Sequence, residues 1–238
     1  MPPSSPYQVS CKEGTEKQIM QTLSTFFYLA GYGVGLLAFL WMAQRRRLLT
    51  AGIFNVMGAG LAGGLIGAAV TQWAVTGSAG KSVLGAIAGG YLSVFFYKRY
   101  IGLRRPTGDL FAVALCAGEA VGRWGCYFGG CCYGRPTKVV WAVWQHGAWR
   151  HPTQIYLSLV NFLILLILLR EEHSRPPENR LFYLQGMFYC AGRFAVEFFR
   201  DTPLVAGGLS AAQWGCLGGL LFFAAQFLFS QRKTGGAI

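Results

Sequence analysis

The chain has 238 residues, of which 53% are apolar and only 13% are charged. This charged share is about half of that usual for a soluble domain, so it excludes a disordered protein and argues against an ordinary cytosolic enzyme. The net charge is +12, but no stripe of Lys and Arg on a soluble helical face points to nucleic acid as a partner. With 33 glycines and 15% aromatic residues, the composition predicts an integral membrane protein whose helices pack closely.

Seven apolar stretches are long enough, or nearly so, to cross a membrane as helices. They lie at about 22–43, 50–75, 82–97, 110–129, 154–169, 181–199 and 204–229. The alternating hydrophobicity of a β-barrel is missing from the sequence, so we expect an all-α bundle that forms a single polytopic domain over residues 1–238. Residues 1–21 are mostly polar, and we expect no cleavable signal peptide in them.

The basic residues of the connecting segments orient the predicted bundle. Twelve Lys and Arg fall on the side of the C-terminus and seven fall on the opposite side. Because loops in the cytoplasm are enriched in Lys and Arg, we expect the N-terminus outside and the C-terminus in the cytoplasm. Residues 130–153 then form an extracytoplasmic cap, in which Val139–Val143 predicts a short strand. Glu171–Asn179, which contains two adjacent prolines, predicts an inside loop.

Four ionisable side chains lie inside the predicted spans, where each costs about 2.5–3.5 kcal/mol on insertion scales and usually marks a site. Glu119 with Arg123, and Arg193 with Glu197, have i,i+4 spacing and therefore share one helical face. One interpretation is two ion pairs that hold the bundle together. The other is a single polar cavity shared by the fourth and sixth spans.

Arginine favours one class of ligand for such a cavity, because its planar guanidinium binds phosphate bidentately and stays charged. Arg123 and Arg193 lie inside the spans, and Arg135 and Arg200 follow them on the outer side. These residues predict a lipid that carries a phosphate group. They specify a ligand class without specifying a reaction.

The segment Gly-Arg-Trp-Gly-Cys-Tyr-Phe-Gly-Gly-Cys-Cys-Tyr-Gly-Arg-Pro-Thr at 122–137 predicts the binding loop. Irregular backbone at membrane depth is tolerated only inside protein or beside a cavity. Cys126, Cys131 and Cys132, with His146 and His151 further along, could hold zinc, but C-x4-C-C is not a common zinc spacing. We therefore expect no metal and no cofactor, and thiols that pack in the loop or pair with one another.

Three blocks of the sequence resemble the prolipoprotein diacylglyceryl transferase family. They are GRWGCYFGGCCYGRPT at 122–137, HPTQIY at 151–156 and GRFAVEFFR at 192–200. The resemblance implies a multi-pass transferase of the bacterial cytoplasmic (inner) membrane. Such an enzyme moves the diacylglyceryl group of phosphatidylglycerol to the lipobox cysteine thiol of a preprolipoprotein, forms a thioether and releases glycerol-1-phosphate.

The resemblance also implies roles for individual residues. Arg123 and Arg193 would hold the phosphate, Glu197 would orient Arg193, and Tyr28 matches the family's first-span tyrosine. The expected catalytic residues are Arg123, Arg193, Glu197, His151 and Tyr28, and the expected substrate-binding residues are Arg135, Gly134, Cys126, Cys131, Glu119, Arg200 and Gln154.

The chain departs from the family pattern at several positions. The family's histidine before a Gly-Gly pair has no counterpart, since Ala62 precedes the pair here. Cys126 and Cys131 stand where the family has Asn and Glu. These departures indicate a divergent member of the family.

Sulfur attack on the glycerol carbon needs a thiolate, and an ordinary cysteine thiol has a pKa of about 8.5. The candidate proton acceptors are Glu119, Glu197 and His151. Two alternatives to the lipoprotein reaction use the same arginine cavity. The chain could be a paralogue that serves another acceptor, or a membrane protein that binds anionic phospholipid without catalysis.

Overall fold

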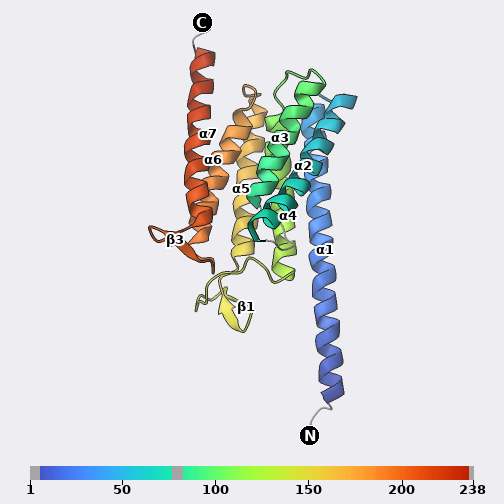
Figure 1. Cartoon of the computed structure of the whole chain (residues 1–238), viewed down its shortest axis with the longest axis vertical. Coiled ribbons are helices and arrows are strands. Elements are labelled where there is room, and N and C mark those ends of the chain that lie inside the picture. Colours follow the sequence, from blue (N-terminus) through green and yellow to red (C-terminus); the bar gives the residue numbers. More distant parts are fainter. Residues whose placement is uncertain (1–5, 77–82, 236–238) are drawn as a thin grey trace. The chain divides into compact units, whose positions relative to one another are not determined.

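The computed structural model describes residues 6–76 and 83–235, which form helices and two small hairpins (Figure 1). The helices are α1 (Pro6–Arg45), α2 (Ala51–Thr76), α3 (Val83–Tyr100), α4 (Gly108–Phe128), α5 (Thr153–His173), α6 (Arg180–Glu197) and α7 (Ala211–Gly235). Strands β1 (Val143–Gln145) and β2 (Ala148–Arg150) pair antiparallel, as do β3 (Leu204–Ala206) and β4 (Leu209–Ser210). The chain divides into two compact units, one of residues up to Phe39 and from Thr107 onward, the other of Leu40–Pro106.

Each predicted span overlaps one helix of the structure. Within the described residues, four helices are long and apolar enough to cross a membrane: Gly14–Arg45 of α1, Gly52–Ala74 of α2, Thr153–His173 of α5 and Ala211–Gln231 of α7. The two helices that contain the charged pairs, α4 and α6, are not among these four. The helical architecture is therefore that of an integral membrane protein.

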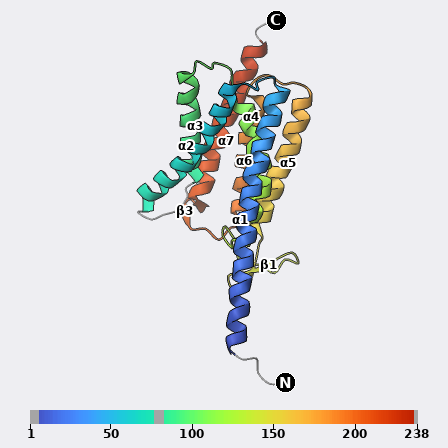
Figure 2. The same ribbon diagram turned by 90° about the vertical axis from the view of Figure 1, so that its right-hand side faces the viewer.

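The first and fifth helices extend beyond their predicted limits. Helix α1 begins at Pro6 instead of near residue 22, and its N-terminal half projects past the ends of α4 to α7 in the same unit (Figures 1 and 2). Helix α5 continues to His173, so the predicted inside loop is shorter by the residues Glu171–His173. Both extensions consist of polar sequence, which hydropathy does not recognise as helix.

The two hairpins also correct the sequence interpretation. The seventh helix begins at Ala211, because residues 204–210, predicted as part of the span, form β3 and β4. Gly207 and Gly208 have φ values of 58° and 72°, as a tight turn with two left-handed residues requires. In the cap, the strand predicted over Val139–Val143 overlaps β1 only at Val143.

In the second unit, α2 and α3 pack backbone against backbone through glycines. A Cβ added at Gly67 would overlap the backbone of Gly85 and Gly89, and one added at Gly63 would overlap Ser93. Small residues at such an interface let the two helices approach closely, which is how helices associate without a hydrophobic driving force between them.

In the first unit, α4 packs against α5 and α6, and α6 packs against α5 and α7. Helix α1 lies against α4, where a Cβ at Gly31 would meet the backbone of Gly118 and Gly122. The Ser24 hydroxyl donates a hydrogen bond of 2.8 Å to the carbonyl oxygen of Gly125. These contacts place residues 24–31 of α1 beside the sequence block 122–137, which predicts the binding loop.

One buried carboxylate joins the beginnings of α4 and α6. Asp109 lies in the first turn of α4, and its two oxygens accept hydrogen bonds of 3.0 Å from the backbone N–H groups of Asn179 and Phe182. The first N–H groups of a helix lack partners within the helix, and a carboxylate there is stabilised by the helix dipole. The two helices that carry the charged pairs therefore start at the same end of the unit and run in the same direction.

Candidate active site

The first charged pair lies among α4, α5 and α6. Glu119 Oε2 accepts hydrogen bonds from Arg123 Nε at 3.0 Å, from Arg123 Nη2 at 2.7 Å and from Asn161 Nδ2 at 3.4 Å. Arg123 Nη2 also donates to the Tyr189 hydroxyl at 3.5 Å. The Arg123 side chain is 12% exposed and that of Glu119 is 34% exposed, so the pair is held by neighbouring helices and still has an open side.

The second charged pair is more deeply enclosed. The Glu197 side chain is 2% exposed, and its Oε2 accepts a hydrogen bond from Arg193 Nη1 and lies 3.8 Å from Arg200 Nε. Its Oε1 accepts from Thr202 Oγ1 at 2.9 Å and from Ser210 Oγ at 3.1 Å. Both oxygens of Glu197 therefore hold protein groups, which fixes the carboxylate and the arginine beside it.

Tyr189 on α6 connects the two pairs. Its hydroxyl accepts the hydrogen bond from Arg123, and the charge of Arg193 also acts on it. The two pairs that the sequence predicts at i,i+4 spacing thus lie in one neighbourhood of the first unit.

The loop after α4 gathers three thiols. The backbone N–H of Cys131 donates a hydrogen bond of 3.1 Å to the carbonyl oxygen of Cys126, and Cys132 adopts a φ of 61°. This fold of the chain places the Sγ atoms of Cys126, Cys131 and Cys132 within 4.8 Å of one another. The hydroxyl of Tyr28, on α1, donates to Cys126 Sγ at 3.3 Å and lies 3.8 Å from Cys131 Sγ.

The charges of two arginines, Arg123 of the first pair and Arg200 after α6, also act on Cys132. Hydrogen bonds from the Cys126 and Cys131 thiols, together with the charges of Arg200 and Arg123, hold the pKa of the Cys132 thiol well below its usual value. The thiol loop is therefore part of the same electropositive region as the two charged pairs.

Two buried donors in this region have no acceptor among the described residues. They are Arg200 Nε and Gln213 Nε2. Gln213 lies on α7 with 2% of its surface exposed, and its Oε1 already accepts a hydrogen bond of 2.9 Å from the backbone of Ser210. A buried donor without a partner costs about 1–3 kcal/mol. Two such donors in this region suit an anionic ligand.

The block 151–156 supports the thiol loop from α5. Thr153 Oγ1 donates a hydrogen bond of 2.7 Å to the carbonyl oxygen of Cys132, and Gln154 Nε2 donates one of 2.8 Å to that of Cys131. Gln154, predicted to bind substrate, thus holds the loop backbone, while its buried Oε1 has no partner among the described residues.

His151, predicted to be catalytic, lies at the base of the cap. Its Nδ1 is 3.1 Å from the Tyr156 hydroxyl, and its ring packs against that of Phe199 at a centroid distance of 5.1 Å. These contacts are therefore with the first turn of α5 and with the segment that follows α6.

Gly134 and Arg135 pair with the chain on both sides of them. The N–H of Gly134 donates to the carbonyl oxygen of His151 at 3.1 Å, and that of Arg135 donates to Phe199 at 2.8 Å. Arg135 Nε donates to the carbonyl oxygen of Arg200 at 3.0 Å. This Gly-Arg turn joins the thiol loop to the segment that follows α6.

Replacement of Gly134 by alanine is expected to disrupt that junction. A Cβ at this position would lie 2.5 Å from the His151 carbonyl oxygen and 2.7 Å from that of Phe199, and neither backbone can move freely. We expect a loss of about 1–3 kcal/mol in the free energy of unfolding, as overpacking generally causes. Thermal unfolding of Gly134→Ala in detergent measures this loss. Gly218→Ala, where no atom lies within 4 Å of the added Cβ, is the control, and equal stability of the two variants would contradict the prediction.

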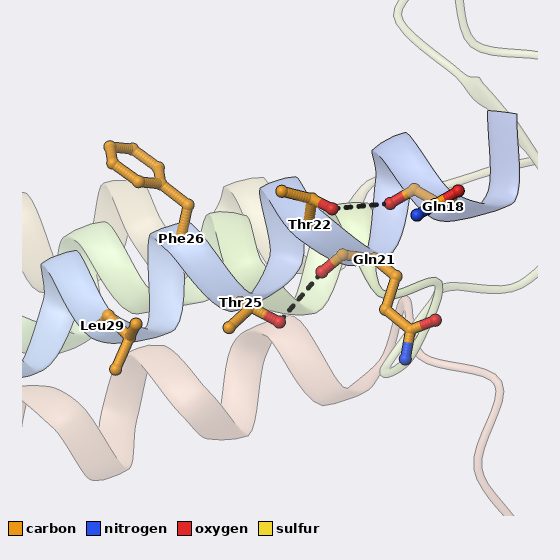
Figure 3. A pocket seen from close by; sticks show the side chains of 6 residues that line it. All are labelled: Gln18, Gln21, Thr22, Thr25, Phe26 and Leu29. Atoms are coloured by element: carbon orange, nitrogen blue, oxygen red, sulfur yellow. Dashed lines mark hydrogen bonds between the residues drawn. The ribbon is translucent and has the colours of Figure 1, made fainter. Parts of the chain in front are cut away.

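One surface hollow of the described residues lies away from the charged pairs. A shallow groove runs along one face of α1 and is lined by Gln18, Gln21, Thr22, Thr25, Phe26 and Leu29 (Figure 3). The hydroxyls of Thr22 and Thr25 donate to carbonyl oxygens of their own helix at 2.9 and 3.0 Å. We place the site at the arginines, because the groove has no charged side chain in its lining.

Several residues of the site escape analysis of the sequence alone. Tyr189 and Ser210 look like ordinary aromatic and turn residues there. Asn161 leaves a signal, because a polar amide within the apolar fifth span is costly without a partner. Arg150 counts in the sequence only toward topology, yet its Nη1 donates to Asp201 Oδ2 at 2.7 Å and to the Gly134 carbonyl oxygen at 3.1 Å.

Comparison with known proteins identifies the family. The model of the prolipoprotein diacylglyceryl transferase domain matches residues 25–229. The chain belongs to the prolipoprotein diacylglyceryl transferase family. The matched residues include the thiol loop, both charged pairs and the Gly-Arg turn.

The similar curated members of this family are named phosphatidylglycerol–prolipoprotein diacylglyceryl transferase. That of Clostridium tetani is 35% identical over 134 residues, 52% of this chain and 53% of the relative. That of Gloeobacter violaceus is 33% identical over 170 residues, 65% of this chain and 62% of the relative. That of Bacillus cytotoxicus is 32% identical over 201 residues, 78% of this chain and 66% of the relative. The chain thus spans about half to two thirds of the length of these relatives.

Proposed function

We propose that this chain transfers the diacylglyceryl group of phosphatidylglycerol to the lipobox cysteine of preprolipoproteins. The observation that carries the proposal is that two arginine–glutamate pairs, from α4 and α6, lie in one region with two buried donors that have no hydrogen-bond acceptor among the described residues. The names of the relatives supply the lipid and the acceptor. The site supplies the chemistry that recognises a phosphodiester.

The proposed topology places the chain in the bacterial cytoplasmic membrane with seven spans, the N-terminus outside and the C-terminus in the cytoplasm. It is supported by the bias of basic residues toward one set of connecting segments. In this orientation, residues 130–153 and the β3–β4 hairpin form an extracytoplasmic cap over the outer ends of α4 to α7. The acceptor cysteine of an exported precursor would reach the site from that side.

In the proposed site Arg123 and Arg193 hold the phosphate of the lipid. Each guanidinium donates hydrogen bonds to a glutamate. Because a guanidinium has five N–H donors, the remaining donors of each arginine can bind phosphate oxygens. Glu197 is a positioning residue, since both of its oxygens are occupied by protein groups. Arg200, whose Nε has no hydrogen-bond acceptor among the described residues and lies 3.8 Å from Glu197 Oε2, adds a third cation.

The proposed reaction is displacement at the glycerol carbon that bears the phosphate. The acceptor sulfur attacks as a thiolate, the new C–S bond forms as the C–O bond breaks, and the phosphate oxygen leaves with the electron pair as glycerol-1-phosphate. The arginines stabilise the charge that develops on the leaving group, an arrangement that is usually the largest single contribution to catalysis. The three candidate proton acceptors, Glu119, Glu197 and His151, each already hold another protein group.

The remaining predicted residues surround this centre in the proposal. Tyr28, Cys126 and Cys131 lie together at the thiol loop, where the acceptor peptide would approach. Gln154, Gly134 and Arg135 hold the backbone of that loop and act on the substrate through it.

The test is reconstitution of the purified protein with phosphatidylglycerol and a lipobox peptide. Mass spectrometry of the peptide is expected to show a diacylglyceryl adduct on the cysteine. Arg193→Ala is the blank. An adduct in the wild type that is missing in the blank is the expected result.

Other outcomes separate the alternatives. Release of glycerol phosphate without a peptide adduct would replace this proposal by a paralogue with another acceptor. Lipid that binds to folded protein without any turnover would replace it by a non-enzymatic lipid-binding protein.

A further inference from the structure

The three thiols of the loop have the arrangement of a metal site. The Sγ atoms of Cys126, Cys131 and Cys132 lie within 4.8 Å of one another. In a tetrahedral zinc site, Zn–S bonds of about 2.3 Å place the sulfur atoms about 3.8 Å apart. A small adjustment of side chains therefore brings three sulfurs onto one ion. The linear spacing argues against such a site, but the reversal of the chain at residues 129–132 removes that objection.

The backbone around the thiols is held in place from several sides. Cys126 belongs to α4, and the carbonyl oxygens of Cys131 and Cys132 accept hydrogen bonds from Gln154 and Thr153. The Tyr28 hydroxyl contacts two of the sulfurs from outside the triad. Partners of this kind orient metal ligands in known sites and are nearly as important as the ligands. The cluster is thus fixed before any ion binds.

We infer that Cys126, Cys131 and Cys132 bind a thiophilic cation, Zn²⁺ or Cu⁺, as a three-thiolate site with Tyr28 as the hydrogen-bonding neighbour. Thiolates select these soft cations over Mg²⁺ or Ca²⁺. Binding releases the remaining thiol protons of the cluster to solvent. Three protein ligands leave the fourth position of a tetrahedral zinc ion to solvent.

A role for the ion follows if the proposed function holds, on which this step rests. The acceptor thiol would take the fourth position in place of water and would release its proton to solvent, because a thiol that coordinates zinc is deprotonated. Its sulfur then forms the bond to the glycerol carbon as the phosphate oxygen leaves with the electron pair. This supplies the thiolate in a chain in which Ala62 precedes the Gly-Gly pair and the three other candidate acceptors hold protein groups.

The first experiment measures binding without any activity. The protein is purified in detergent with its thiols reduced, supplied with ZnCl₂, desalted and analysed for metal content. The expected result is about one zinc ion per chain. Co²⁺ in place of zinc is expected to show the near-ultraviolet absorption of cobalt–thiolate bonds, which reports the ligands directly.

Variants assign the site. Cys131→Ser and Cys132→Ser are expected to lose most of the bound ion and the cobalt–thiolate absorption. The double variant Cys190→Ser/Cys216→Ser is the matched control, because it removes two thiols of α6 and α7 outside the loop. Cys131→Ala repeats the test without a hydroxyl. Gel filtration checks that each variant is folded.

The outcomes distinguish the site from its role. No ion and no cobalt–thiolate absorption in the reduced wild type, or equal binding by wild type and Cys132→Ser, would overturn the site. Binding with equal transfer by wild type and Cys132→Ser would overturn the role and leave the site. Binding without transfer by any sample would overturn the proposed function alone.

Discussion

Arg193→Lys is expected to lower the rate of transfer by a factor on the order of 10² while the protein stays folded. Lysine keeps the charge opposite the buried Glu197, so the ion pair survives. It loses the planar fork that binds phosphate bidentately, and Arg and Lys are not interchangeable at such a site. Removal of one preorganised donor for a developing negative charge typically costs 10²–10³ in rate, as found for an oxyanion-hole residue. The rate of adduct formation on a lipobox peptide measures the loss.

The matched control is Arg180→Lys on the same helix. Arg180 also pairs with a glutamate, Glu171, at 3.3 Å, but it lies at the first turn of α6. Its replacement should leave transfer nearly unchanged. Equal losses in the two variants would show that the arginines act through the fold, and the assignment of Arg193 to the lipid phosphate would then be wrong.

Glu197→Leu is expected to be the most destabilising single change in the first unit. Removal of one partner from a buried ion pair costs about 3–5 kcal/mol, because the other charge is left buried without compensation. Glu197 also accepts hydrogen bonds from Thr202 and Ser210, which lose their acceptor in the variant. Thermal unfolding in detergent should show a large fall in Tm.

The double variant Arg193→Met/Glu197→Leu separates stability from function. An apolar pair of similar volume often replaces a buried ion pair without loss of stability. We therefore expect the double variant to recover part of the lost Tm and to remain inactive. A double variant that recovers activity together with Tm would mean that the pair is only structural.

The helical architecture could be predicted from the sequence because lipid exposure leaves long apolar stretches. The limits of the helices could not be predicted where polar residues continue a helix beyond its apolar stretch. Helix α1 begins at Pro6 through sequence such as Gln18 and Gln21, which has no hydropathy signal. The β3–β4 hairpin does have a sequence signature, because Gly207–Gly208 between short apolar runs is typical of a hairpin turn. The surrounding apolar residues made this stretch look like part of a span.

The candidate site was predictable where charge conflicts with lipid. Glu119, Arg123, Arg193 and Glu197 stand out because a charge inside a span is expensive. The partners that hold them did not stand out, because their roles depend on which helices become neighbours. Tyr189 is an example: nothing in its own sequence context indicates that it lies beside arginines of two helices.

Asp109, which contacts the beginnings of both α4 and α6, is a common reference point for distances along these two helices. With a rise of about 1.5 Å per residue, Glu119 lies about 15 Å along α4 from Asp109. On α6, Arg193 lies about 16 Å from Phe182, whose N–H donates a hydrogen bond to Asp109. Arg123 and Glu197 follow at about 21 and 22 Å. The acid comes first on α4 and second on α6, so each level has one acid and one arginine. Opposite charges of the two helices therefore lie at matching heights. A residue inserted into either helix before its pair would shift that pair by about 1.5 Å and rotate it by about 100°, and the charges would no longer match.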